Sequence, residues 1–196
     1  MDVAARFKQY HSESVRTIES LSQNEMFCAK FVQLVDLSVK TLESGNRIFT
    51  AGNGGSFADA LHISGELVNF FTIPHKPYPV MALGSNGAVL SAWANDHNFN
   101  SQLSRELTAF AHPGDLLIAI TTSGKSQNIR MLVETAKALG VYTSVLTGKF
   151  GQENLPEVNV CLSIDSTVTP HIQEAHVIVY HALCAEIERH LTQGEA

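Results

Sequence analysis

The chain has 196 residues, 44% of them hydrophobic and 16% charged, a balance that suits a globular protein with a real core and excludes a disordered one. Its formal net charge of −6 argues against a general nucleic-acid binder, because such a protein needs a basic face to displace counterions from phosphates. The three cysteines, Cys28, Cys161 and Cys184, are scattered and form no CxxC pair, which favours a reducing compartment over a disulfide framework.

The N-terminal residues carry charges and show no targeting segment. Asp2, Arg6 and Lys8 fall within the first ten residues, where a signal peptide would have a continuous apolar stretch. No apolar run along the chain reaches the roughly 18 residues that a membrane-spanning helix needs. We therefore expect a cytoplasmic protein with neither a membrane nor a nucleic-acid partner.

The first 45 residues are expected to form two helices. A polar helix covers roughly residues 3–21. A second helix begins after Asn24, whose side chain can cap its first turn, and ends at Gly45. Its apolar residues recur at near-helical spacing, namely Phe27, Phe31, Leu34, Leu37, Val39 and Leu42.

Short apolar runs and helical patterns alternate over the rest of the chain. Strands are expected at 47–51, 79–83, 116–120, 143–147 and 158–164. Helices are expected at about 57–71, 88–94 and 127–139, with Gly140 closing the third of these. A long final helix runs from Pro170 to about His190, and the proline suits its first turn.

This alternation predicts the fold class. Near-continuous apolar strands that alternate with helices indicate a parallel sheet covered on both faces. We expect one domain over residues 1–196, a three-layer α/β/α sandwich with a five-stranded parallel sheet of flavodoxin-like type. The N-terminal helices occupy about 3–45 and the α/β core about 46–192. In such sheets ligands bind at the carboxyl ends of the strands.

The loop after the third expected strand has the composition of a phosphate site. It offers hydroxyl groups, a glycine for a tight turn and the amide groups that open the next helix. Its hydroxyl residues are Thr121, Thr122, Ser123 and Ser126. It is not a Walker loop, since Ala119 stands where that pattern needs its first glycine. The alternative is a plain strand-to-helix turn with a serine cap.

A second loop, Gly52-Asn-Gly-Gly-Ser56, follows the first expected strand. Its glycines permit the backbone to approach a ligand closely. It departs from the dinucleotide-binding pattern, because the third glycine of that pattern is missing. An ordinary turn has the same composition, so the loop alone does not decide between the two interpretations.

Acidic and imidazole side chains recur on two of the expected helices. Asp59, His62 and Glu66 are three and four residues apart and share one helix face. On the last helix Gln173 and His181 are eight residues apart, within one broad face. These nitrogen and oxygen donors make a plausible set of ligands for a divalent metal. A hydrogen-bonded surface pair is the alternative for His62 and Glu66.

Other polar residues have plain interpretations when taken alone. Asn95 and Asp96 are expected in a capping turn between two helices. Lys125 is either a point charge that attracts phosphate or an exposed loop lysine. A surface or capping role is expected for five histidines without a partner pattern, namely His11, His75, His97, His112 and His190.

Together these motifs resemble, in order and spacing, those of the phosphoheptose isomerases, a family of the sugar isomerase (SIS) domain superfamily. The motifs are Gly52-Asn-Gly-Gly-Ser56, His62 with Glu66, Asn95-Asp96, Thr121-Thr-Ser-Gly-Lys-Ser126, and Gln173-Glu-Ala-His176 with His181. The resemblance runs from the leading helices to about Leu191.

The resemblance implies an aldose–ketose isomerase that converts sedoheptulose 7-phosphate to D-glycero-D-manno-heptose 7-phosphate. In the family this is the first step toward activated heptose for bacterial surface polysaccharides. The resemblance also implies an SIS-type five-stranded sandwich, a homotetramer with sites at subunit interfaces, and one Zn2+ per subunit.

By the same likeness, individual residues receive roles. The substrate-binding set is Asn53, Gly54, Gly55, Ser56, Glu66, Asn95, Asp96, Thr121, Thr122, Ser123, Ser126 and Gln173. The family's zinc positions are matched by His62, Glu66, Gln173 and His181. Glu66 and His181 match the acid–base pair, which moves a proton between C1 and C2 through a cis-enediol. Which of the two is the initial base stays open.

One position departs from the family pattern. Members commonly place an arginine four residues after the catalytic glutamate, and here that position is Phe70. The missing guanidinium removes an anion contact or an interface ion pair. This loss affects the prediction of the exact phosphosugar more than the prediction of the reaction class. The alternatives are an isomerase of another phosphosugar and a non-catalytic SIS scaffold like the protein that binds the replication initiator DnaA. That scaffold lacks a carboxylate at the position of Glu66.

Overall fold

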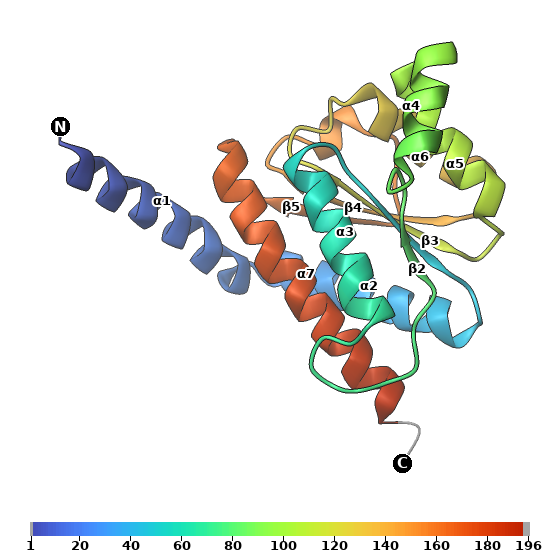
Figure 1. The fold of residues 1–196 in the computed structure, drawn as a ribbon. Helices are drawn as coiled ribbons and strands as arrows, with labels where there is room; N and C mark the ends of the chain where they lie inside the picture. The colour runs from blue at the N-terminus through green and yellow to red at the C-terminus, as the bar shows by residue number, and fades with distance from the viewer. Residues whose placement is uncertain (1, 194–196) are drawn as a thin grey trace.

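The computed structural model describes residues 2–193 and confirms the predicted fold class (Figure 1). Five strands form one parallel sheet in the order β2-β1-β3-β4-β5, which is the flavodoxin-like order. They are β1 Ile48–Ala51, β2 Val80–Ala82, β3 Leu116–Thr121, β4 Tyr142–Gly148 and β5 Val160–Ile164. Every residue of β3 is buried, as expected for a central strand covered on both faces.

Two helices precede the sheet, as predicted, and each begins at a capping side chain. α1 (Val3–Gln23) follows Asp2, and α2 (Glu25–Glu43) follows Asn24; both side chains accept a hydrogen bond from an amide of the first turn. Gly45 has a φ of +77°, a left-handed conformation that ends α2 where the sequence predicts it.

The remaining helices alternate with the strands. They are α3 Gly55–Val68, α4 Gly87–Asp96, α5 Gln102–Phe110, α6 Gln127–Ala138 and α7 Thr169–Thr192, with short 3-10 turns at Phe99–Ser101 and Gln152–Asn154. The sequence prediction gave no bounds for α5, and the ends of two other helices differ from it. α3 ends at Val68 rather than near residue 71, because the amides of residues 71–73 donate to Glu188 and not to carbonyl groups of α3. α4 extends to Asp96, so Asn95 and Asp96 form its last turn instead of a capping turn.

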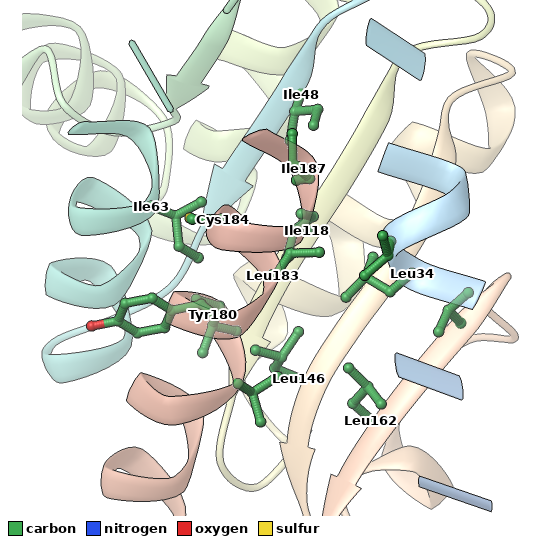
Figure 2. Close-up of a cluster of buried hydrophobic side chains, with 14 of the residues drawn as sticks. Leu34, Ile48, Ile63, Ile118, Leu146, Leu162, Tyr180, Leu183, Cys184 and Ile187 are labelled. Atoms are coloured by element: carbon green, nitrogen blue, oxygen red, sulfur yellow. The ribbon is translucent and has the colours of Figure 1, made fainter. Parts of the chain in front are cut away.

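The two faces of the sheet bury different side chains. Alternate residues of a strand point to opposite faces, so Ile118 packs with α2, α3 and α7, whereas Leu117 packs with α5 and α6. Figure 2 shows the first of these clusters, with Leu34 of α2, Ile63 of α3 and Leu183 of α7. α2 therefore belongs, with α3 and α7, to the helix layer on one face of the sheet.

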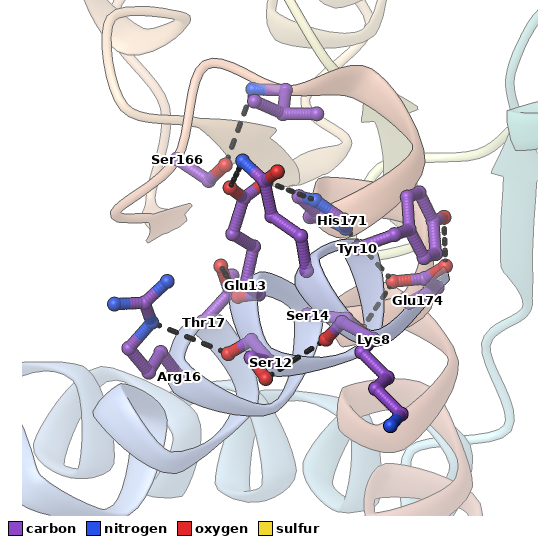
Figure 3. Close-up of polar contacts among 12 residues, drawn as sticks. Lys8, Tyr10, Ser12, Glu13, Ser14, Arg16, Thr17, Ser166, His171 and Glu174 are labelled. Atoms are coloured by element: carbon purple, nitrogen blue, oxygen red, sulfur yellow. Dashed lines mark hydrogen bonds and ion pairs between the residues drawn. The ribbon is translucent and has the colours of Figure 1, made fainter. Parts of the chain in front are cut away.

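α1 extends away from the sheet and is tied to the beginning of α7 (Figures 1 and 3). The Glu174 carboxylate accepts hydrogen bonds from the hydroxyls of Tyr10 and Ser14, and it lies 3.2 Å from Nδ1 of His171. These contacts fix the middle of α1 beside the first two turns of α7. Within residues 2–193 no helix combines the length and apolar character needed to cross a membrane.

One histidine of α7 is buried in the core. His176 is 0% exposed, and its Nε2 atom lies 3.4 Å from the Thr147 carbonyl oxygen at the end of β4. Burial lowers the pKa of His176 from 6.5 to about 4, although the contact with Thr147 raises it slightly. The imidazole is therefore neutral in the folded protein at pH values where it is protonated in the unfolded chain.

This difference predicts a loss of stability in acid. Between pH 6.5 and 4 the unfolded state binds a proton that the folded state does not, so the free energy of unfolding falls as the pH falls. At about 1.4 kcal/mol per pH unit, the contribution of His176 amounts to roughly 3 kcal/mol over this window. Chemical denaturation of the wild type and of His176→Gln at pH 4 to 7 measures it. The buried Asp59 has the opposite slope in both proteins, so only the difference between them is informative. Parallel pH profiles would contradict the assignment.

Candidate active site

A small pocket lies at the carboxyl ends of β1 and β3, beside the first turns of α3, α6 and α7. Its volume is about 150 Å3. The lining residues are Asn53, Ser56, Ile120, Thr121, Thr122, Ser123, Ser126, Thr169 and Gln173. All of them except Ile120 and Thr169 belong to the predicted substrate-binding set. The structure thus brings both predicted loops and the beginning of α7 to one place, which we call the loop pocket.

The loop after β3 is a tight turn that only glycine allows. Gly124 has a φ of +67°, and a Cβ atom there would lie 2.1 Å from the Gly151 carbonyl oxygen. The Gly124 amide donates to Thr121 Oγ1 at 3.3 Å, and the Lys125 amide donates to Ser123 Oγ at 3.3 Å. The turn therefore holds its hydroxyl groups at the edge of the pocket.

Ser126 adds a hydroxyl at the start of α6. It is the N-cap residue, yet within residues 2–193 its side chain makes no capping hydrogen bond. Its hydroxyl is therefore left for a ligand. Serine and threonine hydroxyls beside a helix N-terminus can bind a phosphate dianion through charge-assisted hydrogen bonds and the helix dipole.

The glycine-rich loop packs against α6 and α7. A Cβ atom on Gly55 would lie 2.3 Å from Nε2 of Gln173, so the absence of a side chain lets this amide reach the loop. Asn53 and Asn128 exchange two amide hydrogen bonds of 2.8 and 2.9 Å. Asn128, which is buried in the first turn of α6, was not predicted from the sequence. Thr169 was not predicted either, and only its place before Pro170 could have indicated that residue.

A second cluster lies farther along the same two helices. His62 and Glu66 of α3 and His181 of α7 have potential ligand atoms within 4.8 Å of one another. His62 Nε2 lies 2.8 Å from Glu66 Oε1, and the rings of His62 and His181 are 5.0 Å apart. His62 is exposed, and the other two are half-buried. We call these three residues the triad. Two imidazoles and one carboxylate are a donor set found at catalytic zinc sites, so the triad fits such an ion.

Tyr180 contacts His62 on the buried side of the triad, and Asp59 lies near Tyr180. The Tyr180 hydroxyl reaches from α7 toward α3 (Figure 2) and lies 2.9 Å from Nδ1 of His62. Burial, and then the nearby Asp59 carboxylate, raise the pKa of Tyr180 to about 12, so the hydroxyl stays protonated at neutral pH. A partner on Nδ1 orients the ring and directs Nε2 toward Glu66 and the open side.

Asp59 is a buried residue and not a member of the triad. Burial raises its pKa to about 6, while His62 and the Tyr180 hydroxyl lower it. Its Oδ2 atom has no hydrogen-bond partner among the described residues. The face that Asp59 shares with His62 and Glu66 in sequence is therefore divided, with Asp59 on the buried side and the other two toward solvent.

Phe71 covers one side of the triad. Its ring is stacked on the His181 ring, with a centroid distance of 5.3 Å and an interplanar angle of 15°. The sequence analysis did not identify Phe71, which follows Phe70, the residue that replaces the family arginine. Phe70 itself is 44% exposed, so this replacement leaves an apolar side chain at the surface.

Gln173 lies apart from the triad, and Asn95 and Asp96 lie apart from the loop pocket. Gln173 lines the loop pocket, and eight residues of α7, or about 12 Å of helix axis, separate it from His181. Asn95 and Asp96 are exposed, and Asn95 donates to Asp96 Oδ1 at 2.9 Å. Neither lines the loop pocket in the described part of the chain.

The prediction for His75 was wrong. Its side chain is 1% exposed, and its Nε2 atom lies 3.1 Å from Glu188, whose side chain is 0% exposed. Its ring is stacked on Tyr78 at 4.0 Å. The partner stands 113 residues away in the sequence, so no local pattern could indicate it.

Two larger grooves lie elsewhere in residues 2–193. Two open grooves of about 570 and 560 Å3 follow the junction of α1 and α2 along β5, and they contain none of the predicted site residues. Volume alone therefore does not identify the site, because these grooves contain neither the hydroxyl-rich loop nor the His62–Glu66–His181 cluster.

Comparison with known proteins places this geometry in context. A family model for the SIS domain matches residues 9–148. A relative named phosphoheptose isomerase, from Crocosphaera subtropica, is 39% identical over 168 residues and is matched over 86% of this chain and 86% of its own length.

Two solved structures of phosphoheptose isomerases have the same fold. One from Francisella tularensis has a TM-score of 0.91, and one from Neisseria gonorrhoeae a TM-score of 0.88. Each is 29% identical, over 96% of this chain and all of the other. The likeness extends over nearly the whole length of both chains.

Proposed function

The chain belongs to the SIS domain family and, within it, to the phosphoheptose isomerases, and from this premise we propose that it converts sedoheptulose 7-phosphate to D-glycero-D-manno-heptose 7-phosphate. The reaction is an aldose–ketose isomerisation, in which a proton moves between C1 and C2. The alternatives are the isomerisation of another phosphosugar and a role as a non-catalytic scaffold.

The observation that carries the proposal is the spacing of the loop pocket and the triad along α7. About 12 Å of helix axis separates Gln173 of the pocket from His181 of the triad. At about 1.2 Å per bond of an extended chain, the eight bonds from C1 of a heptose 7-phosphate to its phosphorus span roughly 10 Å. A long open-chain sugar can therefore have its phosphate in the pocket and its reacting carbons at the triad.

The residues of the loop pocket would bind and orient the substrate. The hydroxyls of Thr121, Thr122, Ser123 and Ser126 would hold the phosphate. By likeness to the family, the sugar would contact Asn53, Gly54, Gly55, Ser56, Asn95, Asp96, Glu66 and Gln173. Anchoring the phosphate restricts the motion of the far end of the chain, which is how remote binding contributes to rate.

Glu66 and His181 would move the protons. A carboxylate takes the carbon-bound proton at one carbon and returns it at the next, while the imidazole transfers a proton between the two oxygens. Only Oε1 of Glu66 contacts His62, so the carboxylate has a second oxygen for the proton. Phe71 stacked on His181 excludes water from one face of that ring.

We propose that His62, Glu66 and His181 hold one zinc ion per subunit, with Gln173 as the fourth ligand by likeness to the family. In this structure the Gln173 side chain lines the loop pocket, so it would have to turn toward the triad to reach the ion. The donor types support this assignment, and so does the Tyr180 hydroxyl that orients His62. Zinc bound there would polarise the carbonyl and stabilise the negative charge of the enediolate.

By likeness to the family, we further propose that the protein forms a homotetramer with its sites at subunit interfaces. We also propose that it acts in the cytoplasm, in the synthesis of surface polysaccharides. The small loop pocket supports the shared site. Its volume of about 150 Å3 is below the roughly 300–1,000 Å3 of pockets that enclose a small molecule. A partner subunit would complete the enclosure.

The test of the function is turnover of sedoheptulose 7-phosphate, with products identified by NMR and zinc measured by elemental analysis. We expect formation of the aldoheptose phosphate and about one zinc per chain. Removal of zinc by a chelator should abolish most of the activity, and added zinc should restore it. Full activity in metal-free protein would exclude the metal role. No turnover by folded, zinc-loaded protein would favour another phosphosugar, and binding without turnover of any phosphosugar would favour a scaffold.

A further inference from the structure

A carboxylate on α7 holds the segment that follows α3. The side chain of Glu188 is 0% exposed and accepts five hydrogen bonds, all from residues 71–75. The donors are the Phe71 amide, the Thr72 amide at 2.8 Å, the Thr72 hydroxyl at 2.9 Å, the Ile73 amide at 3.0 Å and His75 Nε2 at 3.1 Å. Figure 1 shows this segment passing beside the last turns of α7.

The carboxylate is charged in this position. Burial raises the pKa of Glu188, but the hydrogen bonds from the backbone of residues 71–73 outweigh burial and leave the pKa below its ordinary value. A buried charge is tolerated only when such partners satisfy it. Three successive amides that point at one carboxylate have a fixed conformation, so Glu188 determines the path of the chain here.

The same segment carries the ring that lies on His181. Phe71 donates its amide to Glu188 and stacks its ring on the imidazole. Glu188 and His181 are seven residues apart on α7, which is two helical turns and therefore one face. Residues 71–75 thus contact both side chains: they donate hydrogen bonds to Glu188, and the Phe71 ring stacks on His181.

We propose that Glu188 is a positioning residue for His181, because it holds the Phe71 ring against the imidazole and so restricts the imidazole to one orientation. This inference rests on the proposed function for its effect on turnover. Its structural half, the dependence of the Phe71–His181 stack on Glu188, stands without it. A ring that is free to rotate spends less time aligned for proton transfer, so the rate of the chemical step falls while substrate binding is kept.

The first test compares Glu188→Gln with Glu186→Gln. Glu186 is partly exposed on the same helix and forms an ion pair with Arg189. We expect Glu188→Gln to lower kcat about 10-fold to 100-fold with KM within about twofold, and Glu186→Gln to change neither. Phe71→Leu should lower kcat similarly, because it removes the ring and keeps the carboxylate. The double variant should be no worse than the poorer single variant, since both changes act through one contact.

The second test does not depend on activity. In metal-free protein, NMR of His181 should show a ring-current shift from Phe71 that is absent in Phe71→Leu and reduced in Glu188→Gln, but kept in Glu186→Gln. A wild-type shift in folded Glu188→Gln, or an unchanged kcat in Phe71→Leu, overturns the proposal. So does a double variant in which the two losses multiply. If Glu188→Gln fails to fold, Phe71→Leu still decides the effect on turnover. If the protein has no isomerase activity, the NMR shift still tests the stack, so the two failures are distinguishable.

Discussion

Glu66→Gln is expected to lower kcat by about 10²-fold to 10⁴-fold, the range for loss of a general base, while the protein stays folded. A neutral amide cannot take the carbon-bound proton. Glutamine has nearly the same shape as glutamate, so it fits this half-buried position beside His62. Turnover of sedoheptulose 7-phosphate measures the loss, and thermal denaturation checks the fold.

The control for this variant separates proton transfer from metal binding. Zinc content is measured in the same samples, because Glu66 is also a proposed ligand. An exposed carboxylate on α6 supplies the matched variant, Glu134→Gln, which should turn over like the wild type. Glu66→Gln with normal zinc and near wild-type turnover would remove Glu66 from the acid–base mechanism. Low zinc with activity restored by excess zinc would assign Glu66 to metal binding alone.

The double variant Ser123→Ala, Ser126→Ala is expected to weaken binding of the phosphosugar about 10²-fold to 10⁴-fold. Each hydroxyl would lose a hydrogen bond to a charged group, worth about 1.5–3 kcal/mol, and each 1.4 kcal/mol is a factor of ten in affinity. Calorimetric titration with sedoheptulose 7-phosphate measures the loss. The fold should persist, since Ser126 makes no capping bond within the described residues.

Two comparisons make the phosphate assignment specific. Ser91→Ala removes a serine that bonds to its own helix in α4, and it should bind the phosphosugar like the wild type. Inorganic phosphate should compete with the sugar in the wild type and lose this ability in the double variant. Unchanged affinity of the double variant for both ligands would show that the phosphate binds elsewhere.

Much of the fold was predictable because its signals are local. The cap Asn24 and the buried run of β3 depend on neighbours within a few residues, so the sequence indicates them directly. The end of α3 was not predictable in this way. Residues 69–71 continue the helical pattern, but Glu188, more than 110 residues later, binds the amides that the helix would have used.

The candidate site also combines residues that local sequence patterns indicate with residues that only tertiary packing brings together. Residue types and spacing within one helix or loop identify His62 with Glu66, and the hydroxyls of the loop after β3. Only the packing of α7 against α3 brings His181 to that pair, and it adds Tyr180 behind His62. Such contacts join residues that are over a hundred positions apart, and sequence periodicity carries no information on them.

The sequence by itself determined the succession of the five strands and of most helices along the chain, the family, and the loops that hold candidate ligands, because periodicity, capping and turn residues act over short distances. The tertiary structure alone decided which polar residues meet. It joined the two loops into one pocket, buried Asp59 and His75, and bound residues 71–75 to Glu188. The physical reason is that burial and ion pairing depend on distance in space, and chain topology sets that distance.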